Sequence, residues 1–180
     1  IARAVLAVPT QSGNLTYTGN AQSPTLTGYD ANKMTLGGDT SKTDSGSYSA
    51  TVTPKANYQW PDGATSAKSV PWSIGKAAGS LSISPTTVAL TGAGDTSVIA
   101  VTRAGNGAIS ATSSNTGVAT VSISGDYVVV TGKGEGSATI TVKVAEGSNH
   151  LAPSNKTASV SVTKPTVANS TWDNIKAISE

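Results

Sequence analysis

The chain has 180 residues, of which only 12% are charged, and its twelve basic and ten acidic side chains give a net charge of +2. Because Lys and Arg are scattered along the chain, the sequence argues against a nucleic-acid binder and against contact with a membrane, both of which need a basic patch. No apolar run approaches the roughly 18 residues of a membrane span. Cysteine is absent and there is one histidine, which excludes disulfides and metal sites built from Cys or from several His.

Ser and Thr together supply 51 residues and Gly another 19, while Phe is absent. Such a composition also occurs in disordered linkers, but here Val, Ile and Thr alternate along short runs. That alternation is typical of strands that bury one face. The sequence therefore predicts an all-β fold, and its length suits either one large domain or two small ones.

Residues 1–75 contain short strand-like runs separated by Gly, Asn, Asp and Pro turns. These runs are 1–9, 15–19, 24–29, 33–36, 47–53, 57–63 and 67–74. The Gly-rich and Asp-rich stretch 37–46 is expected to be a hairpin loop.

Four blocks of this half stand in a characteristic order: Leu-Thr-Tyr-Thr-Gly at 15–19, Thr-Asp-Ser-Gly-Ser-Tyr at 43–48, Tyr-Gln-Trp-Pro-Asp-Gly at 58–63 and Val-Pro-Trp-Ser-Ile at 70–74. In these blocks the half resembles bacterial Ig-like repeats of Gram-positive surface proteins and of phage proteins. The resemblance implies an Ig-like β-sandwich over 1–75. It also implies a tyrosine corner, in which the hydroxyl of Tyr48 bonds to nearby backbone.

Residues 76–80, Lys-Ala-Ala-Gly-Ser, predict a short linker because they are small and flexible in composition. They include no carboxylate, which argues against a junction stiffened by calcium. The second half opens with 81–90, where Pro85 divides one run into two. A proline in this place favours an edge strand that changes sheets.

The clearest pattern in the chain spans 118–144, where three runs rich in β-branched residues are separated by two turn clusters and predict a β-meander. In the last run Ala138, Ile140, Val142 and Val144 share one face, and Ser, Thr and Lys occupy the other. An apolar strand face must be covered, and a second sheet is the simplest cover. Other strands are expected at 96–103, 108–113 and 158–162.

Three blocks of this half, at 81–90, at 114–121 (Ser-Asn-Thr-Gly-Val-Ala-Thr-Val) and at 134–142 (Gly-Glu-Gly-Ser-Ala-Thr-Ile-Thr-Val), resemble the group 2 bacterial Ig-like family. That family is known from intimin-type and invasin-type surface proteins. The resemblance covers 79–163 and implies a second sandwich over 81–163, used as a spacer or adhesive module without catalysis.

The tail, 164–180, changes period, since Trp172, Ile175 and Ile178 recur every three residues after a capping Ser170. It predicts a short helical segment. The segment is interpreted as the start of a helix or of a further domain, with docking on the second sandwich as the alternative.

No catalytic, cofactor or metal site is predicted. His150 lies in a predicted loop, where an exposed histidine is a simpler interpretation than a catalytic base without partners. Asp39 and Asp44 share a loop and are interpreted as turn residues, with weak cation binding as the alternative. The run Gly132-x-Gly-x-Gly136 resembles a phosphate loop only superficially, because no helix pattern follows it.

The first half also holds six of the aromatic residues, Tyr17, Tyr29, Tyr48, Tyr58, Trp60 and Trp72. In a chain without Phe they are expected to fill the core. The alternative is an exposed platform of Tyr58 and Trp60 that binds carbohydrate, and these two residues are the candidate ligand site.

The sequence thus predicts a non-catalytic structural or adhesive module, two Ig-like sandwiches in tandem, within a larger extracellular protein of a bacterial cell surface or a phage virion. The expected partners are host-cell or surface proteins and glycans, or other virion or surface subunits. The alternative function is a carbohydrate-binding module that uses exposed aromatics of the first domain.

Overall fold

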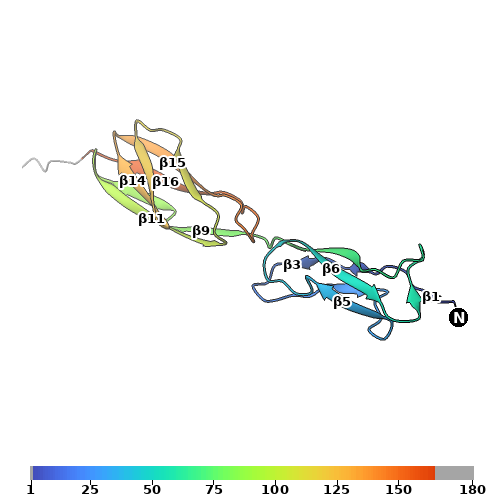
Figure 1. Cartoon of the computed structure of the whole chain (residues 1–180). Coiled ribbons are helices and arrows are strands. Elements are labelled where there is room, and N and C mark those ends of the chain that lie inside the picture. Colours follow the sequence, from blue (N-terminus) through green and yellow to red (C-terminus); the bar gives the residue numbers. More distant parts are fainter. Residues whose placement is uncertain (1, 165–180) are drawn as a thin grey trace, which may run out of the picture. The chain divides into compact units, whose positions relative to one another are not determined.

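The computed structural model describes residues 2–164, and all regular elements within them are β-strands (Figure 1). The all-β prediction is therefore confirmed. The helical segment predicted for the tail lies outside the described residues.

The chain divides into two compact units. Within residues 2–164, the first comprises residues 2–79 together with the short segments Gly105–Gly107 and Glu146–Ala152, and the second comprises the other described residues. The change of unit between Gly79 and Ser80 falls inside the predicted linker, 76–80; that these residues act as a flexible linker stays a prediction.

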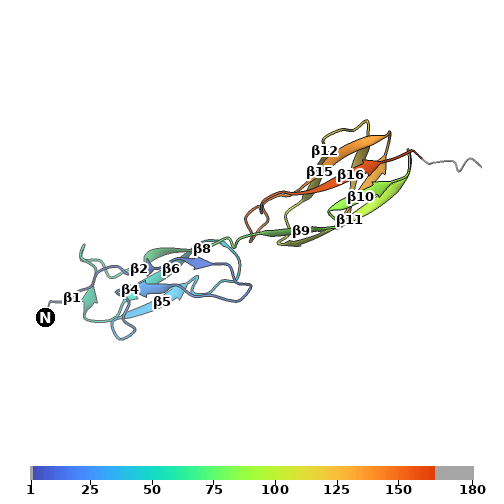
Figure 2. The same cartoon turned by 180° about the vertical axis from the view of Figure 1, so that it is seen from behind.

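The second unit is a sandwich of two four-stranded sheets, visible from both sides in Figures 1 and 2. Its strands are β9 (Ser80–Ser84), β10 (Thr87–Leu90), β11 (Thr96–Ala104), β12 (Ile109–Ser113), β13 (Ala119–Ser124), β14 (Tyr127–Gly132), β15 (Gly136–Val144) and β16 (Lys156–Val162). One sheet has the order β13-β14-β11-β9 and the other the order β10-β16-β15-β12. The β-meander predicted over 118–144 is therefore wrong in its third strand, because β13 and β14 pair with each other whereas β15 pairs with β12 and β16 in the other sheet.

Pro85 separates two strands that belong to different sheets. β9 pairs antiparallel with β11, whereas β10 pairs parallel with β16. A proline cannot donate a ladder hydrogen bond, so the chain leaves the first sheet there and can enter the second. The predicted change of sheets at Pro85 is confirmed.

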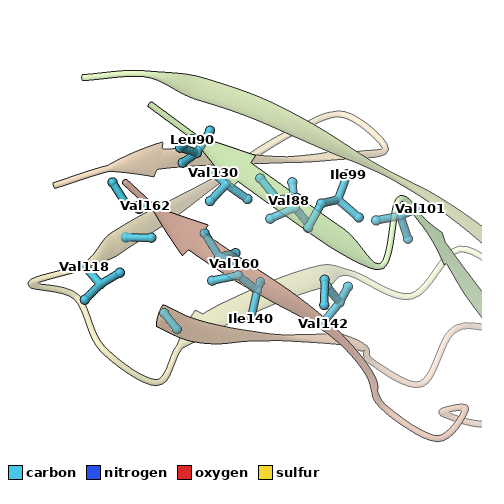
Figure 3. Packing of buried hydrophobic residues seen from close by; sticks show 14 of the residues in the cluster. Val88, Leu90, Ile99, Val101, Val118, Val130, Ile140, Val142, Val160 and Val162 are labelled. Atoms are coloured by element: carbon cyan, nitrogen blue, oxygen red, sulfur yellow. The ribbon is translucent and has the colours of Figure 1, made fainter. Parts of the chain in front are cut away.

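The interior of the second unit is almost wholly aliphatic because its strands alternate strictly. On β15 the side chains of Ala138, Ile140, Val142 and Val144 are buried, as predicted. Figure 3 shows side chains from both sheets pointing toward one another across this interior. The buried cluster is made of Leu81, Val88, Leu90, Ile99, Val101, Val118, Ala119, Val128, Val130, Ala138, Ile140, Val142, Val144, Ala158, Val160 and Val162.

The first unit has one well-developed sheet and two short strand pairs. Its strands are β1 (Ala4–Val5), β2 (Thr10–Ser12), β3 (Leu15–Thr16), β4 (Thr25–Thr27), β5 (Met34–Gly38), β6 (Gly46–Pro54), β7 (Tyr58–Gln59) and β8 (Lys68–Gly75). The main sheet has the order β3-β8-β6-β5, and β2 pairs with β4 and β1 with β7.

The long first strand predicted over 1–9 is only partly right, since just Ala4–Val5 of it is paired as a strand. Pro9 offers no N–H to a ladder, and Gly13 and Gly19 adopt φ angles of 73° and 81°, far from the extended values of a regular strand. The layer opposite the main sheet is therefore broken into short pieces.

Large rings fill the space that this short layer leaves. Trp60 is 0% exposed and Trp72 2% exposed, and each indole N–H reaches a backbone carbonyl, Ser66 O at 2.8 Å and Asp39 O at 2.7 Å. A buried indole needs such a partner. The core-filling interpretation of these two residues is confirmed.

The predicted tyrosine corner is present. The hydroxyl of Tyr48 on β6 donates to the carbonyl oxygen of Asp44 at 2.6 Å, and the Tyr48 ring packs on that of Trp72 with centroids 4.9 Å apart. The bond ties the loop that precedes β6 to the strand itself.

We expect Tyr48→Phe to destabilise the first unit by about 1 kcal/mol, the usual net value of one hydrogen bond, because the ring packing is kept while the donor is lost. Denaturant unfolding measures the change. Tyr58→Phe is the matched control, since Tyr58 is half-buried and its hydroxyl makes no hydrogen bond within residues 2–164. Equal effects of the two substitutions would contradict a role for the corner bond.

We expect Ile140→Ala to destabilise the second unit by about 2–5 kcal/mol, since Ile140 is 0% exposed and its loss leaves a cavity. Thr112→Ala, at an exposed position on the neighbouring strand, should stay within about 0.5 kcal/mol of the parent. Thermal unfolding followed by calorimetry tests both. A shift confined to the transition of the first unit would be inconsistent with the packing described here.

Candidate functional site

The predicted carbohydrate platform is not formed. Trp60 is completely buried, so its ring offers no face to a sugar, and Tyr58 on β7 is half-buried. The physical reason is the core of the first unit, which lacks Phe and takes up the indole to fill its volume. A ligand role for Tyr58 without Trp60 stays a prediction.

His150 lies in the loop between β15 and β16. Its side chain is half-buried, whereas the sequence analysis predicts an exposed one. The part of this loop that contains His150, Glu146–Ala152, belongs to the first unit. There the ring of His150 meets that of Tyr17 edge to face, with centroids 5.4 Å apart. Among the described residues, its ring nitrogens make no hydrogen bond to a hydroxyl or a carboxylate. The arrangement is that of a packed aromatic side chain, without the nucleophile that a catalytic base requires.

Carboxylates at the surface pair locally with cations. Asp39 Oδ1 lies 2.8 Å from Lys42 Nζ, and the hydrogen bond from Lys42 holds the pKa of Asp39 below its ordinary value of 3.8. The alternative of cation binding by Asp39 and Asp44 would need this lysine to leave. Within residues 2–164 no group of three or more Asp, Glu, His or Cys could hold a metal ion, and no helix there is long and apolar enough to cross a membrane.

The glycine run at 132–136 owes its composition to close packing. A Cβ at Gly132 would lie 2.5 Å from the carbonyl oxygen of Gly92, and one at Gly134 would lie 2.9 Å from that of Gly117. Both distances are shorter than any real Cβ tolerates, so only glycine fits. The run leads into strand β15, as the turn interpretation predicts.

The carboxylate of Asp95 stabilises the turn between β10 and β11. It accepts hydrogen bonds from Thr91 N at 2.8 Å, Thr91 Oγ1 at 3.1 Å and Thr96 N at 2.9 Å. These bonds favour the ionised form, and the pKa of Asp95 is therefore lowered from 3.8, chiefly by the backbone N–H of Thr91.

The outer face of the sheet β10-β16-β15-β12 carries a shallow hollow of about 340 Å³, which we name the hydroxyl hollow. Five of its residues present a hydroxyl from a strand and one from the loop after β12, while Ala138 and Val160 contribute to its floor. The hydroxyl residues are Thr87, Ser114, Ser137, Thr139, Ser159 and Ser161. No charged side chain lines this hollow.

The opposite outer face carries an exposed aromatic residue that the sequence analysis missed. Tyr127 on β14 and Val98 on β11 are each 52% exposed, and Tyr127 is the register partner of Ala100 on β11. The signal was present in the alternation: Val128 and Val130 face the interior, which turns Tyr127 outward.

Comparisons with known proteins give low similarities. No family model matches, and no curated protein matches. Among solved structures, domains 1–6 of surface layer protein SbsC align with 26% identity and a TM-score of 0.44 over 80% of this chain and 22% of that one. Domains 4 and 5 of the same protein align with 21% identity and a TM-score of 0.42 over 86% of this chain and 98% of theirs.

Extracellular cadherin domains 1–4 of protocadherin gamma B7 align with 13% identity and a TM-score of 0.33, covering 89% of this chain and 48% of that one. Because these TM-scores are low, the fold assignment rests on the strand order and pairing described above. Membership of the group 2 bacterial Ig-like family stays a prediction.

Asp95→Asn should reduce the acid sensitivity of the second unit. The pKa of Asp95 is lower in the folded state than its ordinary value of 3.8, so the stabilisation is fully present above that value. It is lost as the pH falls below 3.8 through the folded pKa. Denaturant unfolding at a series of pH values between neutrality and strong acid should give a flatter profile for the variant, and superimposable slopes would refute the assignment.

Proposed function

We propose that this chain is a non-catalytic, load-bearing module of an extracellular surface protein, in which folded β-units transmit force and hold other parts of the polypeptide at a distance. The observation that carries the proposal is the same in both units. An early strand pairs in parallel with the last strand: β3 with β8 in the first unit, and β10 with β16 in the second.

Parallel pairing of an early strand with the last strand determines how a unit responds to tension. Tension reaches the start of the early strand through the segment that precedes it and leaves at the end of the last strand, so the two strands are pulled past each other. Their hydrogen bonds then carry the load together, whereas strands pulled from the same end separate one bond at a time. Forced unfolding is governed by the unfolding barrier, which the shearing arrangement raises.

The second unit has the longer parallel pair. Its register runs over four residues of β10, from Thr87 opposite Ser159 to Leu90 opposite Val162, while β3 and β8 share two. The pair continues at both ends, where Ser159 N donates to Thr86 O and Thr163 N to Leu90 O, each at 2.9 Å. Buried Val88, Leu90, Val160 and Val162 fasten the same strands to the opposite sheet. We therefore expect the second unit to yield at the higher force.

Single-molecule stretching with two attachment points tests this proposal. The chain has no cysteine, so Thr163→Cys and Asn155→Cys each provide one unique handle, used with a second handle at the N-terminus. Thr163 follows β16 and Asn155 precedes it, and both are exposed. The first handle shears β10 from β16 and the second unzips them.

We expect a several-fold lower rupture force for the second unit when it is pulled through Asn155→Cys. A similar force in both geometries would contradict a load-bearing role for the β10–β16 pair. Tension on the β3–β8 pair is applied in the same way in both experiments, so the rupture event of that pair serves as the internal reference.

The proposed location is a bacterial cell surface, with a phage virion as the rival. Antibodies raised against the chain separate the two: labelling of intact cells supports the first, and co-purification with phage particles supports the second. Detection only in the cell interior would contradict both locations.

A further inference from the structure

A straight row of hydroxyl side chains crosses the whole sheet β10-β16-β15-β12. Thr87 on β10 is the register partner of Ser159 on β16, which is in turn the partner of Thr139 on β15. Ser114, just past β12, is joined to Thr139 by two hydrogen bonds, Ser114 N to Thr139 O and Thr139 N to Ser114 Oγ, each of 2.9 Å. These four residues, which we name the hydroxyl row, are all exposed and all line the hydroxyl hollow.

Most hydroxyls of the row are free to bind a ligand. Within the described residues, the side-chain oxygens of Thr87, Thr139 and Ser159 make no hydrogen bond to protein atoms. On the outer face of the first unit, by contrast, Ser49 Oγ and Ser69 Oγ bond to each other at 2.6 Å. Ser137 and Ser161, which are register partners one row further along, add two more hydroxyls to the hollow without such a bond.

We propose that the hydroxyl hollow binds an uncharged, linear β-1,4-linked glycan that lies across the strands along the hydroxyl row. Neighbouring strands are about 4.8 Å apart, and one sugar ring of an extended β-1,4 chain advances by nearly the same length. Each successive ring therefore meets one hydroxyl of the row. A hydroxyl both donates and accepts, and so pairs with sugar hydroxyls in either sense.

The chemistry of the hollow argues against other classes of ligand. Anionic or cationic polymers would find no opposite charge among the lining residues. A closely packed apolar partner would bury hydroxyls without hydrogen bonds, which costs free energy. An extended peptide laid along the row advances about 3.3 Å per residue and falls out of step with the strand spacing.

This inference goes beyond the proposed load-bearing function, and either one can fail without the other. Because no aromatic ring stacks on the sugar, binding to a single site should be weak. Many copies of this module bound side by side to one polysaccharide would together bind it tightly through multivalency.

Titration of the isotope-labelled full chain with cellohexaose, followed by amide NMR shifts, tests the proposal. We expect shifts that cluster on β15, β16 and β10 around Thr139, Ser159 and Thr87. Maltohexaose, whose α-1,4 chain curves, should cause much smaller shifts at the same concentration. Ser159→Ala combined with Thr139→Val removes the two central hydroxyls while nearly keeping the volume, and should weaken binding roughly tenfold or more.

Thr112→Val is the matched control, because Thr112 is exposed on β12 of the same sheet but does not line the hollow. It should bind like the parent chain. The proposal is overturned if cellohexaose causes no shifts up to its solubility limit. It is equally overturned if the shifts centre on Tyr127 of the opposite sheet, or if the double variant binds as tightly as the parent.

Discussion

Burial of β-branched side chains between two sheets is the interaction on which this protein depends. With no cysteine to form a disulfide, the second unit is closed by packing, and each fully buried Val, Leu or Ile contributes about 1.5–3 kcal/mol. A strand can bury apolar side chains on the inner face of its sheet only if every second residue is apolar, because successive side chains point to opposite faces. The same requirement leaves the alternate positions free, and in this chain Ser and Thr occupy most of them.

The aliphatic interior also determines where the chain can bear load. β10 and β16 are fixed to the opposite sheet through Val88, Leu90, Val160 and Val162, and to each other through parallel hydrogen bonds. Leaving the first sheet at Pro85 is what allows the N-terminal part of the unit to lie beside its last strand. Packing and hydrogen bonding therefore act on the same two strands.

The two units reach a closed core by different means. The second uses many similar aliphatic residues on long, regular strands, while the first combines one good sheet with short pairs and fills the remainder with Trp60, Trp72 and Met34. Large rings tolerate an irregular layer because one indole replaces several aliphatic contacts and satisfies its N–H on nearby backbone. Trp60 is buried in this core and is not available for a sugar-binding surface. For this reason the platform of Tyr58 and Trp60, the alternative interpretation of the sequence, is absent.

Local patterns in the sequence were sufficient for the positions of the strands of the second unit and for the change of sheets at Pro85, and the resemblance to bacterial Ig-like repeats implied the hydrogen bond of Tyr48. Each depends on residue period or on a neighbour a few positions away. The place of β15 in the opposite sheet, the choice between core and platform for Trp60, and the row formed by Thr87, Ser159, Thr139 and Ser114 were decided by the tertiary structure. The row joins residues up to 72 positions apart in the sequence through strand register. The residue period within one strand does not determine which residue of the neighbouring strand will lie beside a given residue.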